Sequence, residues 1–352
     1  MRPVHRLLRL LLALSVLGSG ALCKAADREA SAPPRPFVAL LLPLEDPDFA
    51  RPAAAVQQGC AVALAMTNSH PPLEVLRADE TPARILSQYE AAIKRGAGAI
   101  VGPMTRRATS ALAASGKVSV PTIALNAPES GDALPAKMEV VSLSVESEAR
   151  AVARAARAEG LREAMVVQAP GALAERAARA FASQWLALKG AISDAQPIGP
   201  KTDLAALRQR LSRSRAEFVF LAADAELARL ARPYLNIRVF ATSQVNDGSA
   251  QGRANVDLDG VRFVDMPWLL EPDHPAVMIY PRVETLAPEL QRFYALGIDA
   301  CRIANERLHA RAPRTLDGVT GRLALKAGGP AEREPVQAVF RDGAPVALEP
   351  SR

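Results

Sequence analysis

Residues 73–101 read LEVLRADETPARILSQYEAAIKRGAGAIV and contain one complete strand–helix–strand unit. The apolar run at the start predicts a strand, and the amphipathic run that follows predicts a helix. Thr81 stands at the N-cap position before Pro82, and Gly96 ends the helix. A second strand is expected at Ala99–Val101. Two parallel strands joined by a helix are the building unit of α/β folds.

The same alternation of short apolar runs and longer amphipathic runs extends over the rest of the chain. The further expected strands are Phe37–Leu44, Thr122–Leu125, Ala164–Gln168, Phe218–Leu221, Arg238–Phe240 and Val261–Val264. The further expected helices are Ala53–Asn68, Thr105–Ser115, Ser144–Glu159, Gly171–Lys189, Asp203–Arg213, Ala225–Tyr234 and Pro288–His309. These series predict two parallel sheets, each covered by helices on both faces. The tail predicts short strands at Leu323–Leu325, Val336–Phe340 and Val346–Leu348, with a hairpin turn at Asp342-Gly343.

The 352 residues are 49% hydrophobic but only 4% aromatic, so Ala, Leu and Val must build most of the core. At about 100–200 residues per domain, this length allows two domains or one large one. Residues 37–348 are expected to form one α/β domain with two lobes. The first lobe takes residues 37–143 and about 266–315, because a late helix returns to it. The second lobe takes residues 144–265 and about 316–348.

Residues 1–25 have the plan of a secretory signal peptide, with three arginines, an apolar run at Leu10–Leu17 and then small residues. The run is shorter than the roughly 20 residues that span a membrane. Cleavage after Ala25 removes four positive charges and no negative one, so the net charge of +6 becomes +2. A nucleic-acid partner is therefore not expected. Residues 26–36 are expected to form a Pro/Ala-rich tether.

Cys23 offers a second way of processing the same segment, which is attachment of a lipid. The lipid-modification motif has Gly, Ala or Ser before the cysteine, and Leu22 departs from it. Cleavage after Ala25 is the alternative, with Cys23 and Ala25 as the small residues of the cleavage site. Both routes export the chain, so the sequence predicts a periplasmic location.

Cys60 and Cys301 lie within the first and last expected helices. Two thiols of an exported protein can pair. Both cysteines have the apolar spacing of core positions, however, and the sequence does not bring their Cα atoms within the roughly 4.4–6.8 Å that a disulfide requires. This favours two buried free thiols.

The sequence offers no catalytic residue, metal site or cofactor site. His70, His274 and His309 lie in different kinds of segment, and neither H-E-x-x-H nor C-x-x-C occurs. The serine-nucleophile motifs S-x-x-K and G-x-S-x-G are also absent. Gly96 and Gly98 precede a strand instead of forming the strand-to-helix turn that binds a dinucleotide.

Five polar residues follow expected strands at their carboxyl ends, where clefts of α/β proteins bind ligands. They are Thr105, Asn126, Asp224, Ser243 and Gln244. Hydroxyls and a helix N-terminus can hold a ligand carboxylate, while an acidic side chain can hold its ammonium group. The same residue types also cap the helices that follow. Both roles remain open for these five residues.

Several runs of the chain are distinctive. They are VALLLPL at Val38–Leu44, GAIVGP at Gly98–Pro103, RPYL at Arg232–Leu235, FATS at Phe240–Ser243, DLDGVRFVDMPWLL at Asp257–Leu270 and YALGIDACRIA at Tyr294–Ala304. Over about residues 37–348 the chain resembles the carboxy-terminal domain of the LppC/LpoA family of penicillin-binding protein activators. The resemblance implies a type I periplasmic-binding-protein-like fold, with two doubly wound α/β lobes, a three-crossing hinge and a cleft. In such a fold we expect Asp257–Leu270 to span a crossing, with Pro267 fixing the turn and Trp268 packing at the lobe junction.

The resemblance also implies a function without catalysis. The expected protein is a periplasmic regulator that binds and stimulates a bifunctional class A penicillin-binding protein in peptidoglycan synthesis. Lipid modification of Cys23 would associate it with the outer membrane. Activators of this family also carry an amino-terminal helical-repeat domain, where this chain has only the tether at residues 26–36. We therefore expect either a partner that itself extends toward this protein or an additional subunit.

Two other classes of function are weighed against this one. A solute receptor would bind an amino acid or small peptide in the interlobe cleft, and the five polar residues named above are its candidate contacts. An exported enzyme is the third class, and for it the sequence supplies no recognisable set of catalytic residues. Bound small molecules or a bound synthase would discriminate between the receptor and the activator.

Overall fold

The computed structural model describes residues 35–79, 81–129, 131, 133–248 and 255–349. The expected signal peptide at residues 1–25, with Cys23, and residues 26–34 of the expected tether lie outside this part of the chain. Among the described residues, no helix combines the length and the apolar character needed to cross a membrane.

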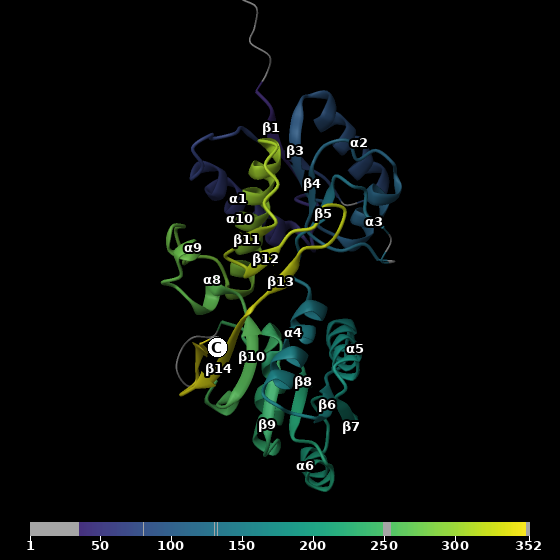
Figure 1. The fold of residues 1–352 in the computed structure, drawn as a ribbon, viewed down its shortest axis with the longest axis vertical. Coiled ribbons are helices and arrows are strands. Elements are labelled where there is room, and N and C mark those ends of the chain that lie inside the picture. The colour runs from purple at the N-terminus through teal and green to yellow at the C-terminus, as the bar shows by residue number, and fades with distance from the viewer. Residues whose placement is uncertain (1–34, 80, 130, 132, 249–254, 350–352) are drawn as a thin grey trace, which may run out of the picture. The chain divides into compact units, whose positions relative to one another are not determined.

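The first lobe contains a five-stranded parallel sheet within the described residues (Figure 1). Its strand order is β2-β1-β3-β4-β5. The strands are β1 (Phe37–Leu42), β2 (Leu73–Arg77), β3 (Ala97–Val101), β4 (Thr122–Ala124) and β5 (Met138–Val140). The covering helices are α1 (Ala50–Ala65), α2 (Pro82–Lys94), α3 (Arg106–Ala114) and α10 (Pro288–Leu308).

Strand β1 shows why this sheet needs helices on both faces, since all six of its residues are buried. Val38, Leu40 and Leu42 belong to the core under α1 and α10. Phe37 and Leu41 belong to the opposite core under α2 and α3. Because successive side chains of a strand point to opposite faces, one apolar run supplies both cores.

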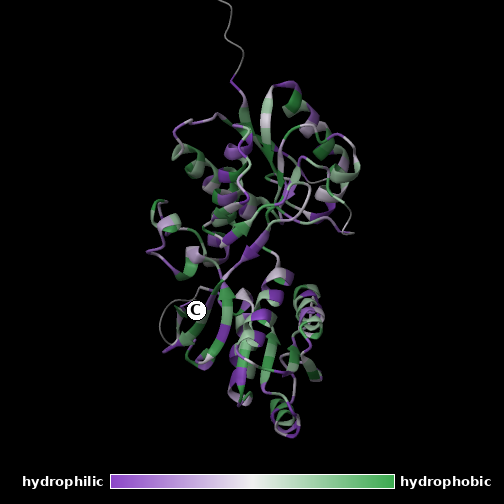
Figure 2. Ribbon diagram, viewed as in Figure 1, coloured by the Kyte–Doolittle hydropathy of each residue, from purple (hydrophilic) through white to green (hydrophobic). Residues whose placement is uncertain are grey.

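The second lobe contains a mixed sheet of seven strands in the described chain, in the order β15-β14-β10-β9-β8-β6-β7. The strands are β6 (Glu163–Gln168), β7 (Ala191–Pro197), β8 (Phe218–Ala222), β9 (Arg238–Ala241), β10 (Val261–Asp265), β14 (Val336–Arg341) and β15 (Ala344–Ala347). The helices are α4 (Val145–Ala158), α5 (Ala172–Ala187), α6 (Leu204–Arg213) and α7 (Ala225–Ala231). Short 3-10 turns lie at Arg232–Tyr234, Ser243–Val245 and Val256–Leu258. Figure 2 shows hydrophobic residues concentrated on the strands, whereas the helices carry both hydrophobic and hydrophilic residues.

The carboxy-terminal tail confirms the expected hairpin. Strands β14 and β15 pair antiparallel, and β14 also pairs antiparallel with β10. Asp342 and Gly343 connect them, with φ angles of 52° and 74°. An Asp-Gly pair is favoured there because a two-residue hairpin turn of this kind needs positive φ at both positions.

The segment before this hairpin differs from the sequence expectation. Residues 316–334, expected in the second lobe, contribute to a separate three-stranded sheet, made of β11 (Thr315–Asp317), β12 (Arg322–Ala324) and β13 (Glu332–Glu334) in the described structure. Leu323 is buried in the core of the first lobe. The buried Asp299 carboxylate of α10 accepts hydrogen bonds from the Val319 and Thr320 backbone N–H groups, at 3.0 and 2.8 Å. These contacts correct the assignment for Val319, Thr320 and Leu323, whose partners lie in the first lobe.

The described chain passes between the two lobes three times, between β5 and α4, between β10 and α8 (Pro267–Leu270), and between β13 and β14. A buried ion pair lies at these crossings, in which Arg333 Nη2 of β13 donates to Glu148 Oε1 of α4 at 2.8 Å. The second oxygen of Glu148 accepts the backbone N–H of Ser243 at 3.1 Å. One carboxylate therefore connects three segments that are far apart in the sequence.

A second buried ion pair joins the strand β10 to the helix α10. Arg292 Nη2 donates to Asp265 Oδ2 at 2.6 Å, and the Asp265 side chain is 1% exposed. Burial alone lowers the pKa of Arg292, but the Asp265 carboxylate reverses this effect and raises the pKa. Arg292 therefore stays protonated and neutralises the buried carboxylate.

Helices α1 and α10 approach each other closely in the first lobe, as Figure 1 shows. A Cβ atom at Gly59 would collide with the carbonyl oxygen of Tyr294, and one at Gly297 would collide with that of Val56. Cys60 directly follows Gly59, and Cys301 lies four residues after Gly297. These two cysteines form a disulfide with a Cα–Cα distance of 5.2 Å. The expectation of two free thiols is wrong, because two glycines that the sequence reasoning did not connect bring the helices together.

Replacing both Cys60 and Cys301 with Ala is expected to lower the free energy of unfolding by about 2–4 kcal/mol. The disulfide joins residues 241 positions apart, so it restricts the unfolded chain strongly. Urea unfolding of the oxidised protein and of the double variant measures the difference. Reducing agent should destabilise the wild type and leave the variant unchanged; an equal response of both proteins would contradict the prediction.

Candidate functional site

The first lobe has a cavity of about 620 Å³ at the carboxyl ends of its strands. Its apolar wall is formed by Phe49, Pro52, Met104, Leu125, Leu143, Phe293 and Leu296. Its polar lining residues are Asp46, Asp48, Asp79, Thr81, Thr105, Arg106, Arg107, Asn126 and Glu129. The polar residues come from the loops that follow β1 to β4, because all these parallel strands end at the same edge of the sheet.

The charges around this cavity are predominantly negative. Four carboxylates and two guanidinium groups line it in the described structure. The pKa of Asp79 is lowered by hydrogen bonds from the backbone N–H and then the hydroxyl of Thr81, so this carboxylate stays ionised. An apolar wall beside ionised carboxylates suits a ligand with an apolar body and a positive charge.

Thr105 and Asn126, predicted from the sequence, both line this cavity. Thr105 is also the N-cap of α3, where its Oγ1 accepts the backbone N–H of Ala108 at 3.2 Å. Asn126 Oδ1 accepts the backbone N–H of Ala127 at 3.0 Å. The cavity therefore brings these two residues together, and both already serve the local backbone.

A smaller cavity of about 210 Å³ lies at the carboxyl ends of strands in the second lobe. Asp224 and Gln244 line it, and Asp224 caps α7 by accepting the backbone N–H of Leu227 at 2.9 Å. Ser243 lines neither cavity, because it is 3% exposed and its backbone contacts Glu148 and Arg292. The five predicted polar residues thus divide into one pair per lobe and one residue at the crossings.

Pro267 and Trp268 lie directly after the crossing from β10. Pro267 is the first residue of α8, and Trp268 is fully buried in the core of the first lobe. The indole Nε1 donates to Gln291 Oε1 at 3.0 Å, and its ring centroid lies 5.3 Å from that of Tyr294. The Trp268 backbone N–H also donates to the carbonyl of Val319 at 2.9 Å.

Sequence reasoning missed several lining residues of the larger cavity. Asp46 and Asp79 follow expected strands, so the same rule that selected Thr105 could have found them. Phe293 and Leu296 carry no such signal, because they reach the cavity from α10. Only the return of this helix to the first lobe places them there.

The described residues that line the two cavities include no histidine and no cysteine. Among the described residues, no group of three or more His, Cys, Asp or Glu side chains is arranged to hold a metal ion. The arrangement offers binding surfaces with hydrogen-bonding and charged groups at the rim.

The family model described as "LppC putative lipoprotein" matches residues 32–343 of the chain. A protein named penicillin-binding protein activator LpoA from Glaesserella parasuis is 27% identical over 322 residues, which cover 88% of this chain and 54% of that protein. The LpoA of Haemophilus influenzae is 25% identical, over 71% of this chain and 45% of its own length. This chain thus spans about half the length of these curated relatives.

Solved structures have the same fold. A putative branched-chain amino acid ABC transporter from Chromobacterium violaceum has a TM-score of 0.75 and 35% identity, covering 87% of this chain and all of that one. The LpoA C-domain from Haemophilus influenzae, described as a regulator of PBP1A, has a TM-score of 0.74 and 23% identity, with 89% and 100% coverage. The expected fold class, type I periplasmic-binding-protein-like with two α/β lobes, is confirmed. With the family model matched over most of its length, the chain belongs to the LppC family.

Proposed function

We propose that this chain is a non-catalytic periplasmic regulator that binds and stimulates a class A penicillin-binding protein. The observation that carries the proposal is the match of the LppC family model to residues 32–343, with curated relatives named penicillin-binding protein activators. The cavities at the carboxyl ends of the strands offer charged and hydrogen-bonding groups, which suit binding of a ligand or partner segment. A regulator needs only about 1–3 kcal/mol of differential binding to shift a synthase toward its active state.

The proposal includes the location of the protein. Residues 1–25 act as the export signal, and processing occurs either after Ala25 or at Cys23 with lipid attachment. The family description as a lipoprotein supports the second route and an outer-membrane association. The intact mass of the protein from the cell envelope separates the routes, because the form with an acylated Cys23 keeps Cys23, Lys24 and Ala25 and carries the lipid, whereas the other form begins unmodified at Ala26.

The test adds purified residues 26–352 to a class A synthase from the same cell and measures glycan polymerisation and crosslinking. We expect both rates, or one of them, to rise several-fold with saturation at a defined ratio of the two proteins. A heat-unfolded sample of the same chain is the control for non-specific effects. Unchanged rates under conditions where the synthase is active would contradict the proposal.

A solute receptor is the second candidate, favoured by the 620 Å³ cavity with its apolar wall and acidic rim. The description of the Chromobacterium violaceum protein as an amino acid transporter component adds support. Calorimetry with amino acids and small basic peptides tests it. Tight binding that is weakened by Phe293→Ala, together with unchanged synthase rates, would replace the regulator by the receptor.

A further inference from the structure

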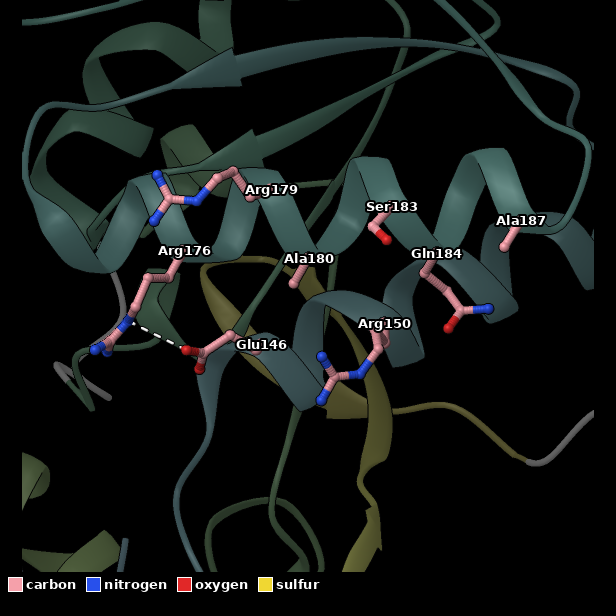
Figure 3. Close-up of a pocket in the computed structure, with 8 residues that line it drawn as sticks. All are labelled: Glu146, Arg150, Arg176, Arg179, Ala180, Ser183, Gln184 and Ala187. Atoms are coloured by element: carbon pink, nitrogen blue, oxygen red, sulfur yellow. Dashed lines mark ion pairs between the residues drawn. The ribbon is translucent and has the colours of Figure 1, made fainter. Parts of the chain in front are cut away.

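Helices α4 and α5 pack side by side in the second lobe and form one wall of a polar groove (Figure 3). Ser147, Arg150 and Arg154 are spaced by three and four residues, which puts them on one face of α4. Arg176 and Gln184 share the corresponding face of α5. Of these residues, Arg150, Arg176 and Gln184 line a cavity of about 460 Å³, together with Glu146, Arg179, Ala180, Ser183 and Ala187.

A second cavity of about 790 Å³ continues from the first, since Arg150 and Gln184 line both. Its other wall is the three-stranded sheet, which contributes Thr315, Arg322, Ala324, Glu332, Arg333 and Glu334. We call the two connected cavities the arginine groove. It is separate from the cavities at the carboxyl ends of the strands, with which it shares no lining residue.

Positive charge exceeds negative charge in the arginine groove. Six arginines and three glutamates line it among the described residues, the arginines being 150, 154, 176, 179, 322 and 333. Arg176 pairs with Glu146 at 3.3 Å, and Arg179 pairs with Glu175 at 3.6 Å.

Several guanidinium groups of the groove lack an acidic partner. Within the described part of the chain, Arg150, Arg154 and Arg322 have no ion pair within 4.0 Å. Arg322 stands opposite Glu334 in the pairing of β12 with β13, and no ion pair joins them. Arg333 is 4% exposed at its side chain, and its Nε has no hydrogen-bond partner among these residues. Arg150 Nη2 donates to the neutral Ser147 Oγ at 3.1 Å, so the positive charges of Arg150, Arg154 and Arg322 remain uncompensated within the described part of the groove.

We propose that the arginine groove binds an acidic peptide segment of a partner protein. Guanidinium groups present paired N–H donors that match the two oxygens of a carboxylate, and Arg150 and Arg154 lie one helical turn apart on the same face. The inference goes beyond the proposed function, because it holds for any partner with such a segment.

The lining of the groove favours a peptide over a membrane surface. Arg150 and Arg176 are half-buried between the helices and Arg333 is buried in the small sheet, where an extended peptide reaches them more easily than a flat bilayer does. Ser147, Ser183, Gln184 and Thr315 add neutral hydrogen-bonding groups, which suit the amide groups of a peptide backbone. Charge complementarity selects acidic side chains for the rest of the segment.

The experiment measures fluorescence anisotropy of a labelled ten-residue oligoglutamate peptide with purified residues 26–352. We expect saturable binding that weakens as salt rises. The variant Arg150→Gln/Arg154→Gln is expected to lose at least tenfold in affinity. The matched control is Arg208→Gln/Arg213→Gln, which removes the same charge from exposed positions of α6 with no ion pair among the described residues.

Each outcome decides the proposal. A tenfold loss in the groove variant with a loss below twofold in the control supports it. Equal losses in both variants indicate a general effect of net charge and overturn it, and so does the absence of saturable binding. Stronger binding to vesicles with anionic lipid than to the peptide, lost in the groove variant, would assign the groove to a membrane.

Thermal unfolding of both variants verifies their folding. The peptide assay contains no synthase, so its result is independent of the stimulation assay.

Discussion

Replacing Trp268 with Ala is expected to lower the free energy of unfolding by about 3–5 kcal/mol. The side chain is fully buried, and its removal leaves a space the size of an indole in the core of the first lobe. Loss of the indole Nε1 donor also removes the hydrogen bond to Gln291 Oε1, and the Tyr294 ring loses its aromatic neighbour. Denaturant melts followed by circular dichroism measure the change.

The variant Trp268→Phe is the matched control for this prediction. It keeps an aromatic ring beside Tyr294 and removes only the outer ring and the Nε1 donor, so a smaller loss than for Ala is expected. A loss below about 1 kcal/mol for Trp268→Ala would show that the side chain does not occupy the core.

The Glu148→Ala variant is expected to lose about 3–5 kcal/mol as well, for an electrostatic reason. The Arg333 side chain is 4% exposed, and Glu148 is its partner in the ion pair at the lobe crossings. Without that carboxylate, a buried positive charge remains uncompensated. The backbone N–H of Ser243 also loses its acceptor.

A second variant separates the loss of the partner from the loss of packing. In Glu148→Leu/Arg333→Met both charges are replaced by apolar side chains of similar length, so most of the stability should return. Urea unfolding of the wild type and both variants makes the comparison. A double variant less stable than Glu148→Ala would refute the explanation by an unpaired charge, and hinge geometry would then depend on the ion pair itself.

The strands that could be predicted from the sequence are those with continuous apolar runs. β1, β6 and β8 are buried between two layers of helices, so composition alone marks them. β7 was missed because it lies at the edge of its sheet, and its sequence AISDAQP has no buried residue, only half-buried and exposed ones. β5 was missed because three residues are too few to show a period.

The candidate site could be predicted only in part, because the local sequence reveals some of its residues and tertiary contacts alone bring in the others. Thr105 and Asp224 could be found, since the rule that places polar residues after parallel strands needs only the local sequence. That rule does not reach Phe293 or the pairing of Glu148 with Arg333, which lies 185 positions away. Buried ion pairs have no signature of spacing, so tertiary structure alone identifies them.

The return of α10 to the first lobe affects how the molecule can be assembled during synthesis. All five strands of the first sheet are complete by residue 140, yet α10, which covers Val38, Leu40 and Leu42 together with α1, begins only at residue 288. Most of the second lobe is made in between, and only its strands β14 and β15 follow later. Until α10 arrives, part of an apolar face of the first sheet stays open to chaperones and proteases, so the first lobe cannot be completed before most of the second has been made.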